Sequence, residues 1–264
     1  MRDCIVCNEA VHASHYCLID GQDYVRCSQC GLVYVDHLLP AEQLYRAYSG
    51  DVLKSLRRKL MAPFRKLHHY GNYSSGMQRA RQIIDFTGRQ LGTAGGRLEY
   101  MDIGCNRGYL LAVAHEQGWN PHGVELVPEL MAPFLNSYPQ YRQQVFSERF
   151  EDVRKKHLKD NSLDVITGID VVEHFEDVVA DLAGIYAVLK PGGVVVLQTP
   201  DAGCARAQRE GCAWGALKPL EHLHLFDGQN FEIIARRVGF SDYSLHEAFE
   251  EADGNFVAVL RKSA

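Results

Sequence analysis

Several features that would assign the chain to a familiar class are absent from it. No run of about 18 uninterrupted apolar residues occurs, and the first residues lack the apolar region of a signal peptide. The 28 Lys and Arg are outnumbered by 33 Asp and Glu, so the net charge of −5 does not favour nucleic acid or anionic membranes as partners. Internal repeats and low-complexity tracts are also missing. These absences predict a soluble cytoplasmic protein with no membrane association.

A glycine turn after an acidic strand end is the most informative feature present. Residues 99–108 read as a strand that ends at Asp102 and breaks at Gly104 and Gly108 before an apolar helix. The spacing matches neither a P-loop nor a dinucleotide fingerprint. A second short strand, 122–125, ends in Glu125, where nucleotide-binding sheets place a ribose-binding acid. The pattern predicts a nucleotide-cofactor site.

The chain resembles the class I S-adenosylmethionine-dependent methyltransferases at this turn. Their Asp-x-Gly-x-Gly-x-Gly motif corresponds to residues 102–108, with Asn106 in place of the middle glycine. The resemblance continues through residues 162–170, Glu173-His174, residues 189–193 and residues 199–201. It implies an α/β fold with a Rossmann-like, seven-stranded methyltransferase sheet in residues 93–264.

Strand-like and helix-like segments alternate after residue 95, which predicts a parallel sheet covered on both faces. The tail predicts a helix from Asp227 to Gly239. A closing antiparallel hairpin is implied by the resemblance. The expected strands are 98–103, 122–125, 143–146, 163–169, 193–199, 243–248 and 255–260.

The same resemblance assigns the S-adenosylmethionine site. Asp102 is expected to hold the methionine amino group, and Glu125 the ribose hydroxyls, with Leu126 against the adenine. Glu151 falls where the family binds the adenine edge, and Asp170 on the floor of the crevice. Further contacts are expected from the turn and from a lid tyrosine: Gly104, Cys105, Asn106, Gly108 and Tyr70.

Four of the eight cysteines form two Cys-x-x-Cys pairs, Cys4 with Cys7 and Cys27 with Cys30. This spacing is typical of a structural Zn²⁺ site, and residues 1–37 are predicted to form a zinc ribbon. A redox pair or free thiols is the alternative, and Cys17, His12 and His15 are substitute ligands in a variant site. Cys105, Cys204 and Cys212 are expected to be ordinary small residues in a reducing compartment.

A helical connector and lid is predicted for residues 38–92, with helices near 40–48 and 75–86. The connector is rich in Lys and Arg between residues 51 and 89, which indicates either a phosphate-binding surface or a solvated helix face. Tyr70 and Tyr73 stand where related enzymes place a lid over donor and acceptor, so Tyr73 is a candidate catalytic residue.

The acceptor side has two candidate clusters for a general base. In the first, Asp170, Glu173 and His174 share a face if a helix begins early enough. Glu173 as a helix cap and His174 as a packing residue is the alternative. A quinone-precursor O-methyltransferase family has Glu-x-x-Glu-His here and uses it with a divalent metal, but Asp170 departs from that pattern.

The second cluster is the Glu221-His222 pair in residues 214–226. Zinc-ribbon sugar C-methyltransferases resemble it with a Tyr-His-Glu-His run, although the tyrosine and their large C-terminal domain are missing here. His222 is the favoured base, followed by His174.

Three functions are compatible with the sequence. The first is O-methylation of a small polar acceptor, such as a sugar, a nucleotide-linked sugar or a biosynthetic intermediate, with sugar C-methylation as a variant. The second is RNA base methylation through the ribbon and the basic connector. The third is a non-catalytic binding module. The acceptor atom, a second metal and the oligomeric state are not determined by the sequence.

Overall fold

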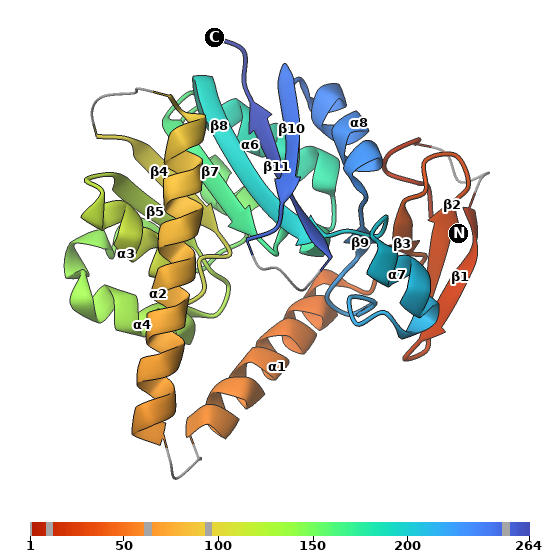
Figure 1. Ribbon diagram of the computed structural model, residues 1–264, viewed down its shortest axis with the longest axis horizontal. Helices are drawn as coiled ribbons and strands as arrows, with labels where there is room; N and C mark the ends of the chain where they lie inside the picture. Colours follow the sequence, from red (N-terminus) through yellow and green to blue (C-terminus); the bar gives the residue numbers. More distant parts are fainter. Residues whose placement is uncertain (1, 9–12, 61–64, 93–96, 250–253) are drawn as a thin grey trace.

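The computed structural model describes residues 2–8, 13–60, 65–92, 97–249 and 254–264, and of residues 51–60 and 65–73 it describes only the backbone. A central sheet is flanked by helices, and a small red sheet stands at one side of it (Figure 1). Within the described ranges, no helix is long and apolar enough to cross a membrane.

The central sheet has seven strands in the order β10-β11-β8-β7-β4-β5-β6. The strands from β8 to β6 are parallel, whereas β11 is antiparallel to both β8 and β10. The predicted α/β sheet and its closing hairpin are therefore confirmed. The strand bounds are β4 Glu99–Ile103, β5 Asn120–Val124, β6 Val145–Phe146, β7 Leu163–Ile169, β8 Leu189–Pro200, β10 Asp242–Glu247 and β11 Asn255–Arg261.

Both faces of this sheet are covered because its strands are apolar on both sides. Tyr100 and Val165 pack with α2 (Arg65–Gln90) and α3 (Tyr109–Glu116) on one face. Met101 and Ile166 face the other side, among buried residues of α5, α6 and α8. The remaining helical bounds are α4 Pro128–Ser137, η1 Pro139–Tyr141, α5 Phe150–His157, η2 Val172–His174, α6 Val178–Val188, α7 Ala205–Glu210, η3 Gly211–Ala213 and α8 Gly228–Val238.

Helix α8 follows its sequence signals at both ends. The Asp227 carboxylate accepts hydrogen bonds from the Gln229 and Asn230 backbone N–H groups and caps the helix. Gly239 ends it with a φ of 116°. The predicted boundaries are confirmed.

The connector consists of two helices that are both longer than predicted. Helix α1 spans Ala41–Leu60, and α2 extends from Arg65 to Gln90. They lie closest together at the bottom of Figure 1, from where α2 rises in front of the central sheet and α1 runs toward the small sheet. Gly76 permits close packing of α2, because a Cβ there would lie 2.6 Å from the Tyr109 ring.

The small sheet has the order β1-β2-β3-β9 and is antiparallel throughout. Three strands come from the N-terminal segment: β1 Ala13–Ile19, β2 Gln22–Cys27 and β3 Val33–Val35. The fourth, β9 His224–Leu225, follows the predicted acceptor residues Glu221 and His222. No local sequence pattern predicts that this distant segment completes the N-terminal sheet.

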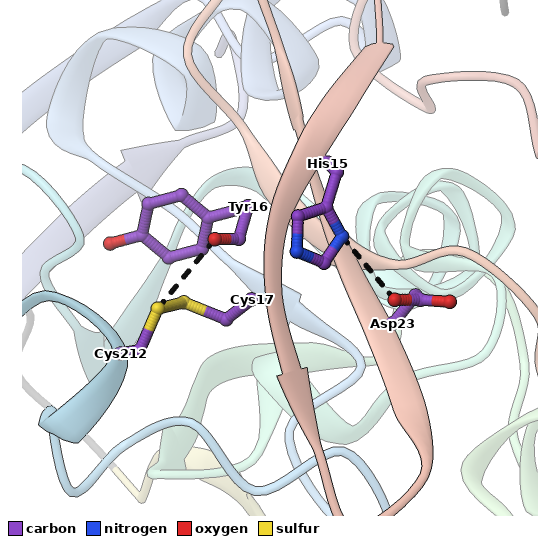
Figure 2. The surroundings of a disulfide bond; sticks show 5 residues. All are labelled: His15, Tyr16, Cys17, Asp23 and Cys212. Carbon is purple, nitrogen blue, oxygen red and sulfur yellow. Dashed lines mark hydrogen bonds and ion pairs between the residues drawn. A yellow bond between two sulfur atoms is a disulfide. The ribbon is translucent and has the colours of Figure 1, made fainter.

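A disulfide joins the same two parts of the chain. Cys17 of β1 is bonded to Cys212 of η3, 195 residues later (Figure 2). The Cys212 Sγ also lies 3.6 Å from the Tyr16 carbonyl oxygen. Cys212 is therefore not the ordinary small residue that was predicted, and Cys17 is not available as a substitute metal ligand. The ring of His15, another proposed substitute, lies with its Nδ1 3.3 Å from Asp23 Oδ1, and His12 lies outside the described residues.

Candidate functional site

A cavity of about 1260 Å³ opens at the carboxyl ends of β4, β5 and β7. Parallel sheets of this kind place ligands at that edge. Its wall includes Asp102 near the end of β4, Glu125 directly after β5 and Asp170 directly after β7. Tyr45 and Tyr48 of α1 complete the wall, so the connector helix lies over the predicted donor site.

The glycine turn adopts the left-handed conformations that its sequence indicated. The φ angles are 74° at Gly104, 47° at Asn106 and 73° at Gly108. At Gly108 a side chain would also meet Phe134, since an added Cβ would lie 2.7 Å from its Cβ. Gly104, Cys105 and Asn106 line the cavity, whereas Gly108 does not.

Asp102 is a buried carboxylate at the edge of the cavity. Its Oδ1 accepts a hydrogen bond of 2.7 Å from the Thr167 hydroxyl. Burial raises the pKa of Asp102 to about 7. A buried carboxylate has lost most of its hydration, so a positively charged group of a ligand would stabilise its ionised form.

Glu125 is oriented by backbone donors on both of its oxygens. The Asn106 N–H donates to Oε2 at 3.0 Å, and the Val127 N–H donates to Oε1 at 2.9 Å. The Tyr48 hydroxyl lies 3.5 Å from Oε1. Burial raises the pKa of Glu125, although these hydrogen bonds oppose the increase. The carboxylate is thus held in one position at the site predicted to bind ribose hydroxyls.

The other predicted donor residues are distributed around the same cavity. Leu126 and Glu151 line it. The Cys105 thiol is directed at Met131, with an Sγ to Sδ distance of 3.0 Å. The side chains of Tyr70 and Tyr73 lie outside the described residues, so both assignments stay predictions.

Asp170 does not share a helix face with Glu173 and His174, contrary to one expectation. Its φ of 56° places it in a turn before η2 rather than in a helix. The carboxylate accepts hydrogen bonds from Gln198 and Asn255, each at 3.0 Å, and pairs with Arg79 at 3.4 Å. Asp170 therefore lines the cavity but belongs to a different network of side chains.

Glu173, His174 and His222 form a compact cluster beside the cavity. One ligand-type atom from each residue lies within 4.8 Å of the others. Glu173 is completely buried, and burial raises its pKa to about 7. Burial lowers the pKa of His222 to about 3, so that ring is neutral. The alternative role of Glu173 as a helix cap is not observed, because Asp177 caps α6.

Backbone carbonyls orient both histidine rings. The His174 Nδ1 is 2.7 Å from the Glu221 carbonyl oxygen, and the His222 Nδ1 is 2.8 Å from that of Ala216. His174 and Glu221 line the cavity, whereas His222 lies behind them. The structure thus brings the two predicted acceptor clusters together. The ring centroids of His174 and His222 lie 5.0 Å apart.

The four predicted zinc ligands also converge. The sulfur atoms of Cys4, Cys7, Cys27 and Cys30 lie within 4.8 Å of one another. The sulfurs of Cys4 and Cys30 are 3.6 Å apart, and those of Cys7 and Cys27 are 3.8 Å apart. Two sulfurs bound to one tetrahedral Zn²⁺ at 2.3 Å would be about 3.8 Å apart.

Each pair of cysteines sits in a matching turn. The Asn8 N–H donates to the Cys4 carbonyl, and the Gly31 N–H donates to the Cys27 carbonyl. Asn8 and Gly31 have positive φ angles of 61° and 79°. The two turns therefore present their sulfurs in the same way, which fits a closed tetrahedral site.

The N-terminal sheet holds the segment that carries Glu221 and His222. The buried Tyr24 hydroxyl donates to the His222 carbonyl at 2.7 Å. The Val35 N–H donates to the Leu223 carbonyl at 3.1 Å, and the Leu223 N–H donates to the Glu173 carbonyl at 2.8 Å. These hydrogen bonds connect the cysteine-containing sheet directly to the acceptor-side cluster.

Tyr45 and Tyr48 are cavity residues that the sequence analysis missed. The Tyr45 hydroxyl donates to the Leu126 carbonyl at 3.2 Å, next to the Tyr48 contact with Glu125. The resemblance predicts lid tyrosines only at Tyr70 and Tyr73. The spacing of Tyr45 and Tyr48 on one face of a predicted helix was the available signal.

Comparison with protein families gives a match to the methyltransferase domain over residues 75–245. The malonyl-[acyl-carrier protein] O-methyltransferase of Serratia marcescens is 28% identical over 128 residues, which are 48% of each protein. The ubiquinone biosynthesis O-methyltransferase of Xanthomonas oryzae pv. oryzae is 30% identical over 120 residues, covering 44% of this chain and 48% of that enzyme. The chain thus spans about half the length of these relatives.

Solved structures agree on the fold. The 1,6-didemethyltoxoflavin-N1-methyltransferase of Burkholderia thailandensis, with bound 1,6-didemethyltoxoflavin and S-adenosylhomocysteine, superposes with a TM-score of 0.57. The comparison covers 95% of this chain and 100% of that one at 18% identity. At this identity the likeness concerns the fold alone.

Proposed function

Because the chain belongs to the methyltransferase domain family, we propose that it transfers the methyl group of S-adenosylmethionine to a hydroxyl of a small polar molecule. The observation that carries this proposal is the meeting of two groups of side chains in one cavity. Asp102 and Glu125 form its donor half, and His174 and Glu221 lie in its acceptor half.

The donor half fits the chemistry of the methyl donor. S-adenosylmethionine, when bound, supplies a methyl group on a positively charged sulfur. Asp102 would pair with its amino group, and the fixed Glu125 carboxylate would accept hydrogen bonds from its ribose hydroxyls. The left-handed turn at Gly104 and Asn106 leaves the backbone open to close approach. Leu126, Glu151 and Tyr48 would bound the rest of the donor.

The acceptor half supplies a proton acceptor. Methylation of a hydroxyl requires removal of its proton near the transition state, for which a positioned histidine is suited. His222 is held neutral by burial, and His174 stands between it and the cavity. Proton removal by this pair, with Glu221 beside it in the wall, is the mechanism we propose. Tyr73, whose side chain lies outside the described residues, stays a predicted catalytic residue.

The charges around the cavity favour a small neutral acceptor, such as a sugar or a hydroxylated intermediate. Acidic residues dominate the wall beyond the donor half, including Glu148, Glu176, Asp177 and Asp181. Two of the three described arginines in this wall pair with acidic residues, Arg149 with Glu176 and Arg79 with Asp170, and the third is Arg107. Such a wall would repel the phosphates of RNA or of a nucleotide-linked sugar.

The N-terminal segment, residues 1–37, is proposed to hold a structural Zn²⁺ through Cys4, Cys7, Cys27 and Cys30. Four thiolates fill a tetrahedral site and leave no position for a substrate, so this metal would stabilise the fold. Residues 38–92 would then serve as connector and lid, and residues 93–264 as the transfer domain.

Transfer of a labelled methyl group from S-adenosylmethionine into a cell extract tests the function. We expect the label in small molecules that nuclease treatment does not change, and its loss in Glu125→Gln. The matched control Glu129→Gln alters an exposed glutamate of α4 and should retain transfer. Label that nuclease converts to small fragments would support RNA methylation instead, and label in neither fraction would contradict methyl transfer.

A further inference from the structure

We propose that Glu173, His174 and His222 bind a divalent transition-metal ion, beside the cavity and separate from the four-cysteine site. The three residues come from two segments that are brought together by the Leu223 to Glu173 backbone hydrogen bond of 2.8 Å. Their ligand-type atoms lie within 4.8 Å of one another. This inference rests on the proposed function, because it assigns the same cluster a metal in the acceptor half.

The hydrogen bonds of the two histidines determine which nitrogen is free to bind a metal. A carbonyl oxygen only accepts, so the Nδ1 of His174 and of His222 must each carry the proton in its contact with Glu221 or Ala216. In the neutral ring this leaves the lone pair on Nε2. Metal-binding histidines commonly donate their other N–H to a backbone carbonyl, which fixes the tautomer and the ring orientation.

Glu173 contributes a buried carboxylate oxygen that lacks a hydrogen-bond donor among the described residues. Its Oε2 accepts a hydrogen bond of 3.0 Å from the Thr199 hydroxyl. Its Oε1 is buried and receives no hydrogen bond from the described residues. An unpaired buried carboxylate oxygen is costly, and a cation held by this oxygen and the two Nε2 atoms would satisfy it.

The distances permit coordination after a small closure of the side chains. Glu173 Oε1 and His174 Nε2 are 4.0 Å apart, compared with about 3.4 Å for two ligands 2.1 Å from one tetrahedral ion. Two imidazoles and one carboxylate favour Zn²⁺ or Fe²⁺ over Mg²⁺ and Ca²⁺, which prefer sites made of oxygen atoms.

Such a site would remain open on one side. Three protein ligands leave a coordination position for water or substrate, in contrast to a site with four cysteines. His174 lies in the wall of the cavity, so an acceptor hydroxyl there is within reach of the cluster. A bound cation would lower the pKa of that hydroxyl, and its proton would leave to water before methylation. With the cation present, His174 and His222 would serve as its ligands, and this ionisation would replace direct removal of the proton by the histidines.

Binding of Co²⁺ alone, without donor or acceptor, tests the inference. Metal-free protein with its disulfide intact is titrated with Co²⁺ and followed by absorption. Co²⁺ on the cysteines gives intense sulfur charge-transfer bands, whereas Co²⁺ on nitrogen and oxygen gives only weak visible bands. We expect both signals in the wild type, loss of the charge-transfer bands in Cys4→Ser, and loss of the second equivalent in His222→Gln and Glu173→Gln.

Two further variants keep the test informative if a buried substitution unfolds the chain. His174→Gln changes a partly exposed ligand, and Thr199→Val removes only the hydrogen bond to Glu173. We expect loss of the second equivalent in the former and about 10–100-fold weaker binding in the latter. His157→Gln, on the exposed side of α5, is the matched control and should bind as the wild type does.

The inference is overturned if the wild type takes up only thiolate-bound Co²⁺, or if the Glu173, His174 and His222 variants retain the second equivalent. Its failure is distinguishable from failure of the proposed function. Methyl transfer without the second Co²⁺ would contradict the metal site alone. A second Co²⁺ with no methyl transfer would contradict the function alone.

Discussion

The N-terminal sheet and the acceptor half of the cavity each contain a cluster of metal-ligand side chains, and the two differ in composition and surroundings. The first has four sulfurs in matching turns and no side chain of the cavity. The second has two imidazoles and a buried carboxylate, and the imidazole of His174 lines the cavity. A closed sulfur site suits a structural role, and an open nitrogen and oxygen site suits chemistry.

The two clusters are nevertheless connected. Strand β3 pairs with β9, Tyr24 binds the His222 carbonyl, and Cys17 is linked to Cys212. The N-terminal sheet is thus part of the framework that positions the proposed acceptor residues. Changes in the cysteine cluster should alter acceptor handling while the donor half, built on β4 and β5, is less affected.

The largest expected effect comes from Cys4→Ser. Structural Zn²⁺ contributes about 10–16 kcal/mol to small zinc modules, so loss of one thiolate should destabilise the N-terminal sheet by several kcal/mol. Zinc content and thermal unfolding measure this. Cys204→Ser, outside the cluster, is the control and should keep the zinc content and the Tm of the wild type. A Cys4→Ser protein with full zinc content and unchanged Tm would remove the distinction between the clusters.

Loss of the disulfide should have the next largest effect. Cys17→Ser opens a crosslink between residues 195 apart, and such crosslinks typically contribute about 2–4 kcal/mol. We expect a lower denaturation midpoint for Cys17→Ser, and the same decrease for Cys212→Ser. Reductant should destabilise the wild type to a similar extent without further effect on either variant. Equal midpoints with and without reductant in the wild type would contradict the link.

The pH dependence of S-adenosylhomocysteine affinity tests the donor half separately from the two clusters. The pKa of Asp102 is raised to about 7, so its carboxyl becomes neutral below that pH and no longer pairs with an ammonium group. The affinity for S-adenosylhomocysteine should therefore increase with pH and level off above about 7. Calorimetry should show up to about a tenfold change per pH unit on the acid side. Asp102→Asn should bind weakly with little of this dependence, and an unchanged profile would exclude Asp102 as its source.

The smallest expected effect is that of Tyr24→Phe. It removes a buried hydrogen bond to the His222 carbonyl, which is worth about 1 kcal/mol. If the N-terminal sheet positions the acceptor residues, KM for the acceptor should increase a few-fold while donor affinity stays constant. Tyr16→Phe, on the neighbouring strand, is the control. Equal KM values for Tyr24→Phe and the wild type would show that the sheet only stabilises the fold.

Local sequence patterns predicted the donor half well because its residues lie close together in the chain. The strand, turn and helix at Asp102 and Gly104 are encoded within about ten residues, and Glu125 follows on the adjacent strand. The same locality explains the helix between Asp227 and Gly239. The positions of these side chains at the cavity agree with the predictions.

Contacts between distant segments were not predictable in the same way. Periodicity does not indicate that β9 pairs with β3, or that Cys17 is bonded to Cys212, because neither contact depends on neighbouring residues in the sequence. Asp170 illustrates a second limit. Spacing suggested a shared helix face with His174, but the positive φ of Asp170 and its partners Gln198 and Asn255 direct it elsewhere.

The most direct test of the account compares donor binding and methyl transfer in Asp102→Asn and His222→Gln. We expect Asp102→Asn to bind S-adenosylhomocysteine much more weakly than the wild type does. His222→Gln should bind it as the wild type does but transfer methyl groups about 100-fold more slowly, the scale of a lost general base. Wild-type transfer by His222→Gln, or wild-type binding by Asp102→Asn, would contradict the division of the cavity into donor and acceptor halves.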